Sequence, residues 1–169
     1  MHNSPSLIEL SEKIARIEAR QQIEQALRDY MRGQDRLLPE VQKRAFHADG
    51  YVNCGLFAGN ALDFIDFAQG FLADCECSQH LIGQMDITFD SQTQAQGEIY
   101  FIAQHRIHTA GQAQDLLVAG RYKDRYEQRD GSWKIAHREE YIDWARTDNA
   151  SDSFLNDPVL LRGSRGEQG

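Results

Sequence analysis

Two polar residues that lie far apart in the chain, Asp35 and His80, have the side chains needed for acid–base chemistry. Asp35 follows the end of a predicted helix, and His80 opens a predicted strand. A carboxylate that accepts one ring N–H of a histidine fixes the tautomer and makes the other ring nitrogen a better base. The sequence permits this contact without requiring it, since an aspartate after a helix is also typical of a cap or a turn.

Three other residues could assist such a base. His105 lies on the strand face that carries Ile99, Phe101 and Ala103, so it would have apolar neighbours if that face lines a pocket. A lone strand histidine is more often structural. Tyr30 and Tyr126 are the tyrosines best placed to offer a hydroxyl, although such residues often belong to a core with the oxygen at its rim.

Arg138 would be informative if it proved to be buried, because buried arginines are rare and usually paired. Strict alternation along its strand places it on one face with Lys134, Ala136 and Glu140, and places Ile135 on the other. If that face is exposed, Arg138 is an ordinary surface charge.

The cysteines do not indicate a metal site. Cys75, Cys77 and His80 are close in sequence, but C-x-C-x-x-H is not a usual zinc spacing. Phosphate-binding glycine motifs and a G-x-S-x-G elbow are absent from the sequence. We therefore expect no metal and no cofactor. With Cys54, the cysteines number three, which does not suggest a disulfide framework and favours a reducing cytoplasm.

The overall composition excludes two classes of partner. The chain has 169 residues with a formal net charge of −8, which disfavours binding to nucleic acid or to an anionic membrane surface. Hydrophobic residues make up 41%, and no apolar run approaches the roughly 18 residues of a membrane span. The N-terminal residues lack the pattern of a secretory signal. We expect a soluble globular protein.

Hydrophobic periodicity changes from helical to alternating along the chain. Helices are predicted from Leu7 to Gly33 with Ser6 as the cap, after Pro39, and over Leu62–Asp74. Strands are predicted at Tyr51–Phe57, His80–Phe89, Gln94–Thr109, Asp115–Arg129 and Trp133–Trp144, with a hairpin turn at Asp130-Gly131. This order predicts an α+β fold, with helices packed on one face of a curved sheet.

We expect one domain over residues 1–145 and a C-terminal tail over residues 146–169. Phe154 and Pro158–Leu161 could fold over a pocket mouth, and the final RGSRGEQG is expected to be disordered.

Three segments resemble the SnoaL-like branch of the NTF2-like (cystatin-like cone) superfamily. They are DYMRGQD, the His80 strand and GRYKDRYEQRDGSWKIAHRE, and the resemblance covers roughly Glu9 to Ala145. It implies about three N-terminal helices packed on a curved, mostly antiparallel sheet that encloses an apolar pocket. The branch includes scytalone dehydratase, hexachlorocyclohexane dehydrochlorinase and bile-acid dehydratases, and it implies an oligomer, either a trimer or a dimer.

The resemblance also implies roles for individual residues. His80 matches the general base, and Asp35 matches the aspartate that orients it. His105 matches a second active-site histidine, Arg138 a pocket arginine, and Tyr30 lies close to a pocket tyrosine. Gln34 and Cys54 stand where scytalone dehydratase has the two tyrosines that hold its catalytic water, so scytalone is not the expected substrate.

The expected function is therefore a cofactor-independent lyase, of dehydratase or dehydrohalogenase type, that removes a carbon-bound proton from a small hydrophobic cyclic substrate. The residues expected to line its pocket are Phe57, Phe67, Phe71, Met85, Ile99, Phe101, Ala103 and Tyr126. A steroid or polyketide isomerase or cyclase could use the same pocket. A non-catalytic binding module, or a subunit like the small subunit of a ring-hydroxylating dioxygenase, is the third alternative.

Overall fold

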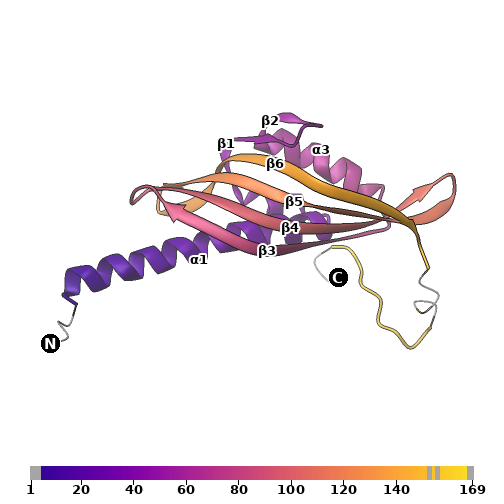
Figure 1. Cartoon of the computed structure of the whole chain (residues 1–169), viewed down its shortest axis with the longest axis horizontal. Helices are drawn as coiled ribbons and strands as arrows, with labels where there is room; N and C mark the ends of the chain where they lie inside the picture. Colours follow the sequence, from indigo (N-terminus) through magenta and orange to yellow (C-terminus); the bar gives the residue numbers. More distant parts are fainter. Residues whose placement is uncertain (1–4, 152–153, 155–156, 167–169) are drawn as a thin grey trace.

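The structure, a computed structural model, describes residues 5–151, 154 and 157–166. Helices come first and an antiparallel meander follows, as predicted (Figure 1). The elements in chain order are α1 (Leu7–Asp35), α2 (Pro39–Lys43), β1 (Phe46–Asn53), β2 (Ala58–Asn60), α3 (Ala61–Ala73), β3 (Cys77–Phe89), β4 (Gln94–Thr109), β5 (Gln112–Arg129) and β6 (Ser132–Asn149). The α+β class is confirmed.

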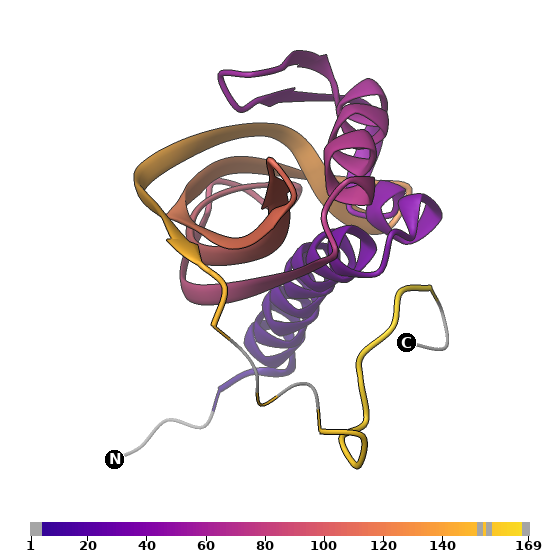
Figure 2. The same cartoon turned by 90° about the vertical axis from the view of Figure 1, so that its right-hand side faces the viewer.

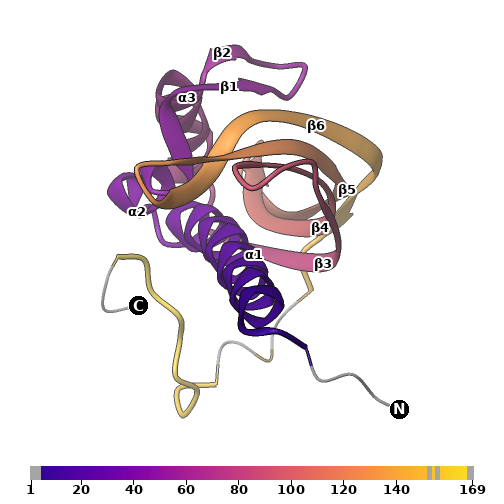
Figure 3. The same ribbon diagram turned by 90° about the vertical axis from the view of Figure 1, so that its left-hand side faces the viewer.

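The strands form one mixed sheet in the order β2-β1-β6-β5-β4-β3. β1 runs parallel to β6, and every other neighbouring pair is antiparallel. Figures 2 and 3 show that the sheet curls strongly around its concave side, with α1 running along the open side of the curl. α1 packs against β3 and β6, and α3 packs against β1 and β2. The end of α1 is thus held beside the start of β3.

α1 begins where the sequence predicts and ends two residues later than predicted. The Ser6 hydroxyl accepts from the backbone N–H of Glu9, and the Glu9 carboxylate accepts from the N–H of Ser6, which makes a capping box. Gly33 does not end the helix. A Cβ there would lie 2.6 Å from the backbone nitrogen of Gln42, so glycine permits close contact between α1 and α2. The left-handed residue after the helix is Leu37, with φ of 53°.

The first strand lies earlier than predicted. β1 covers Phe46–Asn53 and turns at Gly55, whose φ is 77°, into β2. Asp49-Gly50, a dipeptide common in turns, lies within the strand at an irregularity in its pairing with β6. A side chain at Gly50 would lie 2.9 Å from the carbonyl oxygen of His47. The dipeptide therefore serves a bulge rather than a turn.

Two bulges between β5 and β6 bend the sheet and change which residues face inward. One leaves Ala136 without a partner, so Ile135 and Arg138, three residues apart, are both fully buried. Strict alternation had placed these two residues on opposite faces, and that expectation is wrong. At the other bulge, a Cβ on Gly120 would fall 2.0 Å from the Tyr141 carbonyl oxygen, which no side chain could tolerate.

The concave side of the sheet holds the hydrophobic core. Of the predicted pocket residues, four belong to this core: Ile99, Phe101, Ala103 and Tyr126. Phe57 and Met85 are partly buried against it. Phe67 and Phe71 are 43% and 48% exposed, because the buried stripe of α3 runs through Ala61, Phe64, Ile65, Ala68 and Leu72. The predicted pocket aromatics that are still open to solvent, Phe67 and Phe71, therefore lie along α3, at one margin of the core.

Candidate active site

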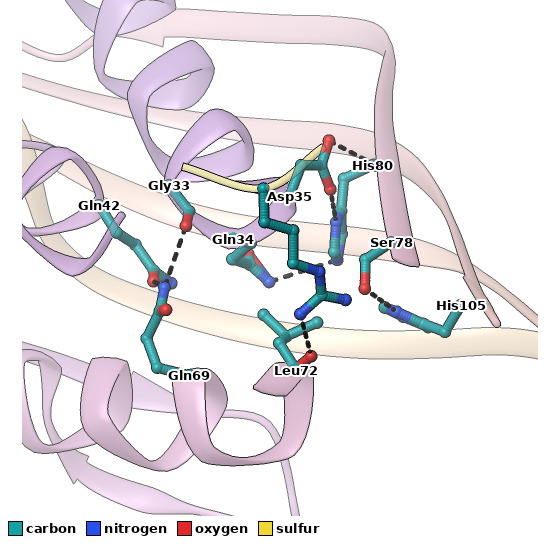
Figure 4. Close-up of polar contacts among 10 residues, drawn as sticks. Gly33, Gln34, Asp35, Gln42, Gln69, Leu72, Ser78, His80 and His105 are labelled. Carbon is teal, nitrogen blue, oxygen red and sulfur yellow. Dashed lines mark hydrogen bonds and ion pairs between the residues drawn. The ribbon is translucent and has the colours of Figure 1, made fainter. Parts of the chain in front are cut away.

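Asp35 and His80 are in direct contact (Figure 4). Asp35 is the last residue of α1, and His80 lies near the start of β3. The Asp35 Oδ1 is 2.6 Å from His80 Nδ1, and Asp35 Oδ2 accepts a 3.1 Å hydrogen bond from the backbone N–H of His80. One carboxylate therefore holds both the ring and the backbone of the histidine. The predicted contact between the two residues is present.

The second ring nitrogen of His80 faces an amide. Gln34 Nε2 lies 3.3 Å from His80 Nε2, while Gln34 Oε1 is buried with no hydrogen-bond partner among the residues that the structure describes. With Asp35 accepting from Nδ1–H, Nε2 carries a lone pair and can accept from the Gln34 amide. This is the tautomer in which Nε2 can take up a proton, provided that a substrate displaces the amide.

His105 is the nearest aromatic neighbour of His80 on the sheet. The two rings meet edge to face with their centroids 5.1 Å apart, and His105 Nδ1 lies 3.2 Å from the Ser78 hydroxyl. Burial and the adjacent His80 lower the pKa of His105 to about 4. His105 is therefore neutral at physiological pH and can offer a ring N–H.

Aromatic side chains extend from this histidine along one margin of the site. The Phe71 ring meets His105 edge on, with a centroid distance of 5.6 Å. Phe57, before β2, packs against both Phe64 and Phe67 of α3. Phe67 and Phe71 remain about half exposed, so they offer an apolar contact surface beside polar groups.

Arg138 and Tyr30 lie apart from these groups, in the interior. Arg138 is fully buried and donates through Nε and Nη2 to the two carboxylate oxygens of Asp124, at 2.8 and 2.6 Å. Its guanidinium carbon lies 4.3 Å from the ring centroid of Tyr30 and 4.0 Å from that of Tyr122. Burial opposes the charge of Arg138, but Asp124 outweighs it and keeps the pKa well above its ordinary value. The arginine is thus paired, as a buried arginine should be.

Glu140 was not singled out as a functional residue in the sequence. It follows Arg138 by two positions on β6 and has no hydrogen-bond or ion-pair partner within the described part of the chain. Burial raises the pKa of Glu140, while the charges of Arg138 and His80 lower it. The sequence places Glu140 on the same strand face as Arg138, and this could have singled it out. It indicates burial of Glu140 only once Arg138 is known to be buried.

The C-terminal tail supplies one group to this region. Phe154, Val159 and Leu161, which could have covered a pocket mouth, are strongly exposed. Ser164 and Gly166 instead hydrogen-bond to Arg36, and Arg165 Nη1 donates to the Leu72 carbonyl oxygen at 2.6 Å, a contact drawn in Figure 4. The last three residues of the tail that was expected to be disordered lie outside the described part of the chain. Nothing in the composition of RGSRGEQG distinguishes Arg165 from Arg162.

Metal ligation has no geometric support in the ranges described. No three His, Cys, Asp or Glu side chains there converge closely enough to hold an ion. Cys75 is buried in the turn before β3, whereas Cys77, the first residue of β3, is exposed. No helix in the same residues is long and apolar enough to cross a membrane.

A family model for the SnoaL-like domain matches residues 15–139. The chain belongs to the SnoaL-like family. The match covers about three quarters of the chain and includes Asp35, His80 and Arg138, and it confirms the predicted place in the SnoaL-like branch of the NTF2-like superfamily.

Solved structures with this SnoaL-like fold include a hexachlorocyclohexane dehydrochlorinase, LinA type 2. It is 18% identical with a TM-score of 0.75, over 82% of this chain and 95% of that one. A protein assigned as a scytalone dehydratase, from Novosphingobium aromaticivorans, is 23% identical with a TM-score of 0.71, over 82% and 93%. A protein assigned as an aromatic ring hydroxylase, from the same organism, is 17% identical with a TM-score of 0.68, over 79% and 94%. At these identities the likeness establishes the fold.

Proposed function

We propose that this SnoaL-like protein is a cofactor-independent lyase that removes a carbon-bound proton from a hydrophobic cyclic substrate. The observation that carries the proposal is the 2.6 Å contact between Asp35 and His80, which leaves His80 Nε2 as the proton acceptor. Dehydrochlorinase and dehydratase relatives of the same fold support a lyase. A non-catalytic module would not need such a contact, so the geometry favours an enzyme.

In the proposed reaction, His80 Nε2 takes the proton, and the electrons of the C–H bond form a carbon–carbon double bond as the bond to a neighbouring hydroxyl or halide breaks. Asp35 stabilises the imidazolium that forms. The ring N–H of His105 supports the departing group, since the Ser78 hydroxyl can hydrogen-bond to the other nitrogen of that ring. General base catalysis of this kind typically contributes about 10² to 10⁴ in rate.

Arg138 and Tyr30 act from the interior in this proposal. Arg138 donates to Asp124 through Nε and Nη2 and is flanked by aromatic rings, while its buried Nη1 has no partner among the described residues. It contributes a fixed positive charge from the interior. The substrate ring rests against Phe57, Phe67 and Phe71. The predicted lining residues Met85, Ile99, Phe101, Ala103 and Tyr126 form the wall behind.

The second candidate is an isomerase or cyclase that uses the same base. Glu140 favours it, because a carboxyl group with a raised pKa in the field of His80 could return a proton to a different carbon. Product mass separates the two, since elimination removes water or a hydrogen halide and isomerisation leaves the mass unchanged.

The test is a mass-spectrometric screen of cyclic alcohols, halides and ketones against the wild type, His80→Ala and His108→Ala. His108 is a half-exposed histidine at the far end of β4, which makes it a matched control. We expect loss of water or halide with the wild type and the control, and a fall of about 10² to 10⁴ in kcat/KM with His80→Ala. Near-native turnover by His80→Ala would overturn the mechanism.

We also propose that the protein is a homo-oligomer, either a dimer or a trimer, that associates through the outer face of its sheet. Tyr100, Ile102, Ile142 and Trp144 are each 41–49% exposed on β4 and β6. Light scattering should give a multiple of the chain mass that falls to the monomer in Trp144→Lys. A monomeric wild type would contradict the proposal.

A further inference from the structure

Arg165 enters the candidate site from a segment that is remote in sequence. The backbone on either side of it is tied to the end of α1, with Arg36 Nη1 donating to the Ser164 carbonyl oxygen at 3.1 Å and the Gly166 N–H donating to the Arg36 carbonyl oxygen at 2.9 Å. These two bonds flank Arg165 and hold it next to the residue that follows Asp35. Its side chain then reaches α3, where Nη1 meets the Leu72 carbonyl oxygen.

Most of the hydrogen-bonding capacity of this guanidinium is unused. Nε and Nη2 of Arg165 are both buried, and neither has a partner among the described residues. Buried donors without acceptors are costly, most of all on a charged group. Nε and one Nη together form the edge that binds a carboxylate through two parallel hydrogen bonds. Arg138 shows this arrangement with Asp124 in the same protein, but Arg165 has no such carboxylate.

The charge of Arg165 acts on the proposed catalytic groups. It is among the charges that lower the pKa of His105, after burial and His80. Burial raises the pKa of the Cys75 thiol, and the charge of Arg165 partly offsets that rise. The positive group therefore lies in the same electrostatic environment as His105, whose ring touches that of His80.

Arginine side chains also lie close to the Asp35–His80 pair on the surface of the protein. A hollow of about 460 Å³ is lined by Asp35, His80 and three arginines that follow one another along α1: Arg28, Arg32 and Arg36. The chain as a whole carries a net charge of −8. Although Arg28 also pairs with Glu24, the three arginines would favour the approach of an anion to this hollow.

We propose that the unoccupied edge of Arg165 binds a carboxylate on the substrate, so that the substrate is a cyclic carboxylic acid. This proposal rests on the proposed function and narrows it to a substrate class. The carboxylate replaces the missing acceptor of Nε and Nη2, the ring contacts Phe71, and the carbon that loses its proton lies toward His80. Arg165 is thus a binding residue supplied by the tail.

The test measures binding and does not require turnover. Calorimetric titration of the full chain compares cyclohexanecarboxylate with cyclohexanecarboxamide, which has nearly the same shape without the charge. Wild type should bind the acid about tenfold more tightly or better, and Arg165→Gln should abolish this preference. Arg165→Lys should keep only part of it, since lysine lacks the planar pair of donors. Arg146→Gln, which removes an exposed arginine of β6, should change nothing.

Equal affinity for acid and amide in the wild type, or an unchanged preference in Arg165→Gln, would overturn the proposal. Binding of inorganic phosphate as tight as that of cyclohexanecarboxylate would also overturn it, because it would indicate an unspecific anion site. His80→Ala separates this inference from the proposed function, because it should retain binding of the acid. Arg165-dependent binding without any elimination would leave the inference standing and refute the lyase. Elimination from neutral cyclic substrates that Arg165→Gln leaves unaffected would support the lyase and refute the inference about Arg165.

Discussion

Among the described residues, two aspartates form largely buried pairs, one with an arginine and one with a histidine. The two pairs differ in how far they are shielded from solvent and in which nitrogen atoms remain free to react. In the interior pair, Arg138 and Asp124, both side chains are fully buried. In the pair at the end of α1, the side chain of Asp35 is 16% exposed and that of His80 is 4% exposed. The interior pair joins β5 to β6, whereas the other joins the end of a helix to an edge strand.

The acceptor atoms show what this difference means. Arg138 donates one hydrogen bond to each carboxylate oxygen of Asp124, and the Tyr126 hydroxyl donates a third at 2.7 Å. Both oxygens of Asp124 therefore have hydrogen-bond donors. Asp35 accepts two hydrogen bonds, both from His80, and the second ring nitrogen of His80 meets only the Gln34 amide. We infer that the first pair stabilises the fold and that the second performs chemistry.

Breaking the interior pair should have the largest effect. Asp124→Asn leaves the Arg138 charge buried without its counter-ion, and this should lower the free energy of unfolding by about 3–5 kcal/mol. Urea denaturation measures the loss. Arg121→Met is the control: Arg121 also pairs with a carboxylate, Asp143, but on the partly exposed outer face, so its removal should cost about 1 kcal/mol or less. Equal losses of unfolding free energy in the two variants would show that the buried Arg138–Asp124 pair stabilises the fold no more than a surface pair does.

His105, whose ring contacts that of His80, should make the stability of the protein depend on pH. Its pKa is about 4 in the folded protein and near 6.5 when unfolded, so between these values the unfolded chain binds the extra proton. The contribution of His105 to the free energy of unfolding is fully present above pH 6.5, and it falls by about 3 kcal/mol as the pH drops toward 4. Denaturation between pH 7 and pH 4 should show a shallower decline in His105→Gln than in His108→Gln. Identical slopes would show that His105 titrates normally.

Asp35→Asn should have the smallest effect on stability and a clear effect on activity. The amide oxygen can still accept from His80 Nδ1–H, but the amide nitrogen cannot accept from the backbone N–H of His80, so we expect a loss of about 1–2 kcal/mol in unfolding free energy. The charge that stabilises the imidazolium is gone, and kcat/KM should fall about 10²-fold or more on a substrate found by the screen. A variant with large instability and normal activity would reverse the roles assigned to the two pairs.

Local signals in the sequence predicted much of this architecture. The Ser6 cap, the bounds of β4 and the Asp130-Gly131 turn depend on neighbouring residues only, and they appear as expected. The inward face of β4, with His105 among apolar residues, also followed from simple alternation.

The misplaced features depend on contacts between distant segments. The bulge at Ala136 arises in the pairing of β6 with β5, and it alone explains why Arg138 faces inward. The contact between Asp35 and His80 was suggested by the family resemblance, since 45 residues separate them. Arg165 carried no signal, because its position depends on how the tail returns to Arg36.

The tautomer of His80 tests the central claim most directly. A base at Nε2 requires that Nδ1 carry the proton and donate it to Asp35, and nitrogen-15 NMR of the imidazole distinguishes the two tautomers without any substrate. We predict a protonated Nδ1 and an unprotonated Nε2 in the free protein at neutral pH, with this arrangement lost in Asp35→Ala. A neutral His80 with its proton on Nε2 would contradict the account, because that nitrogen could not then accept a proton from carbon.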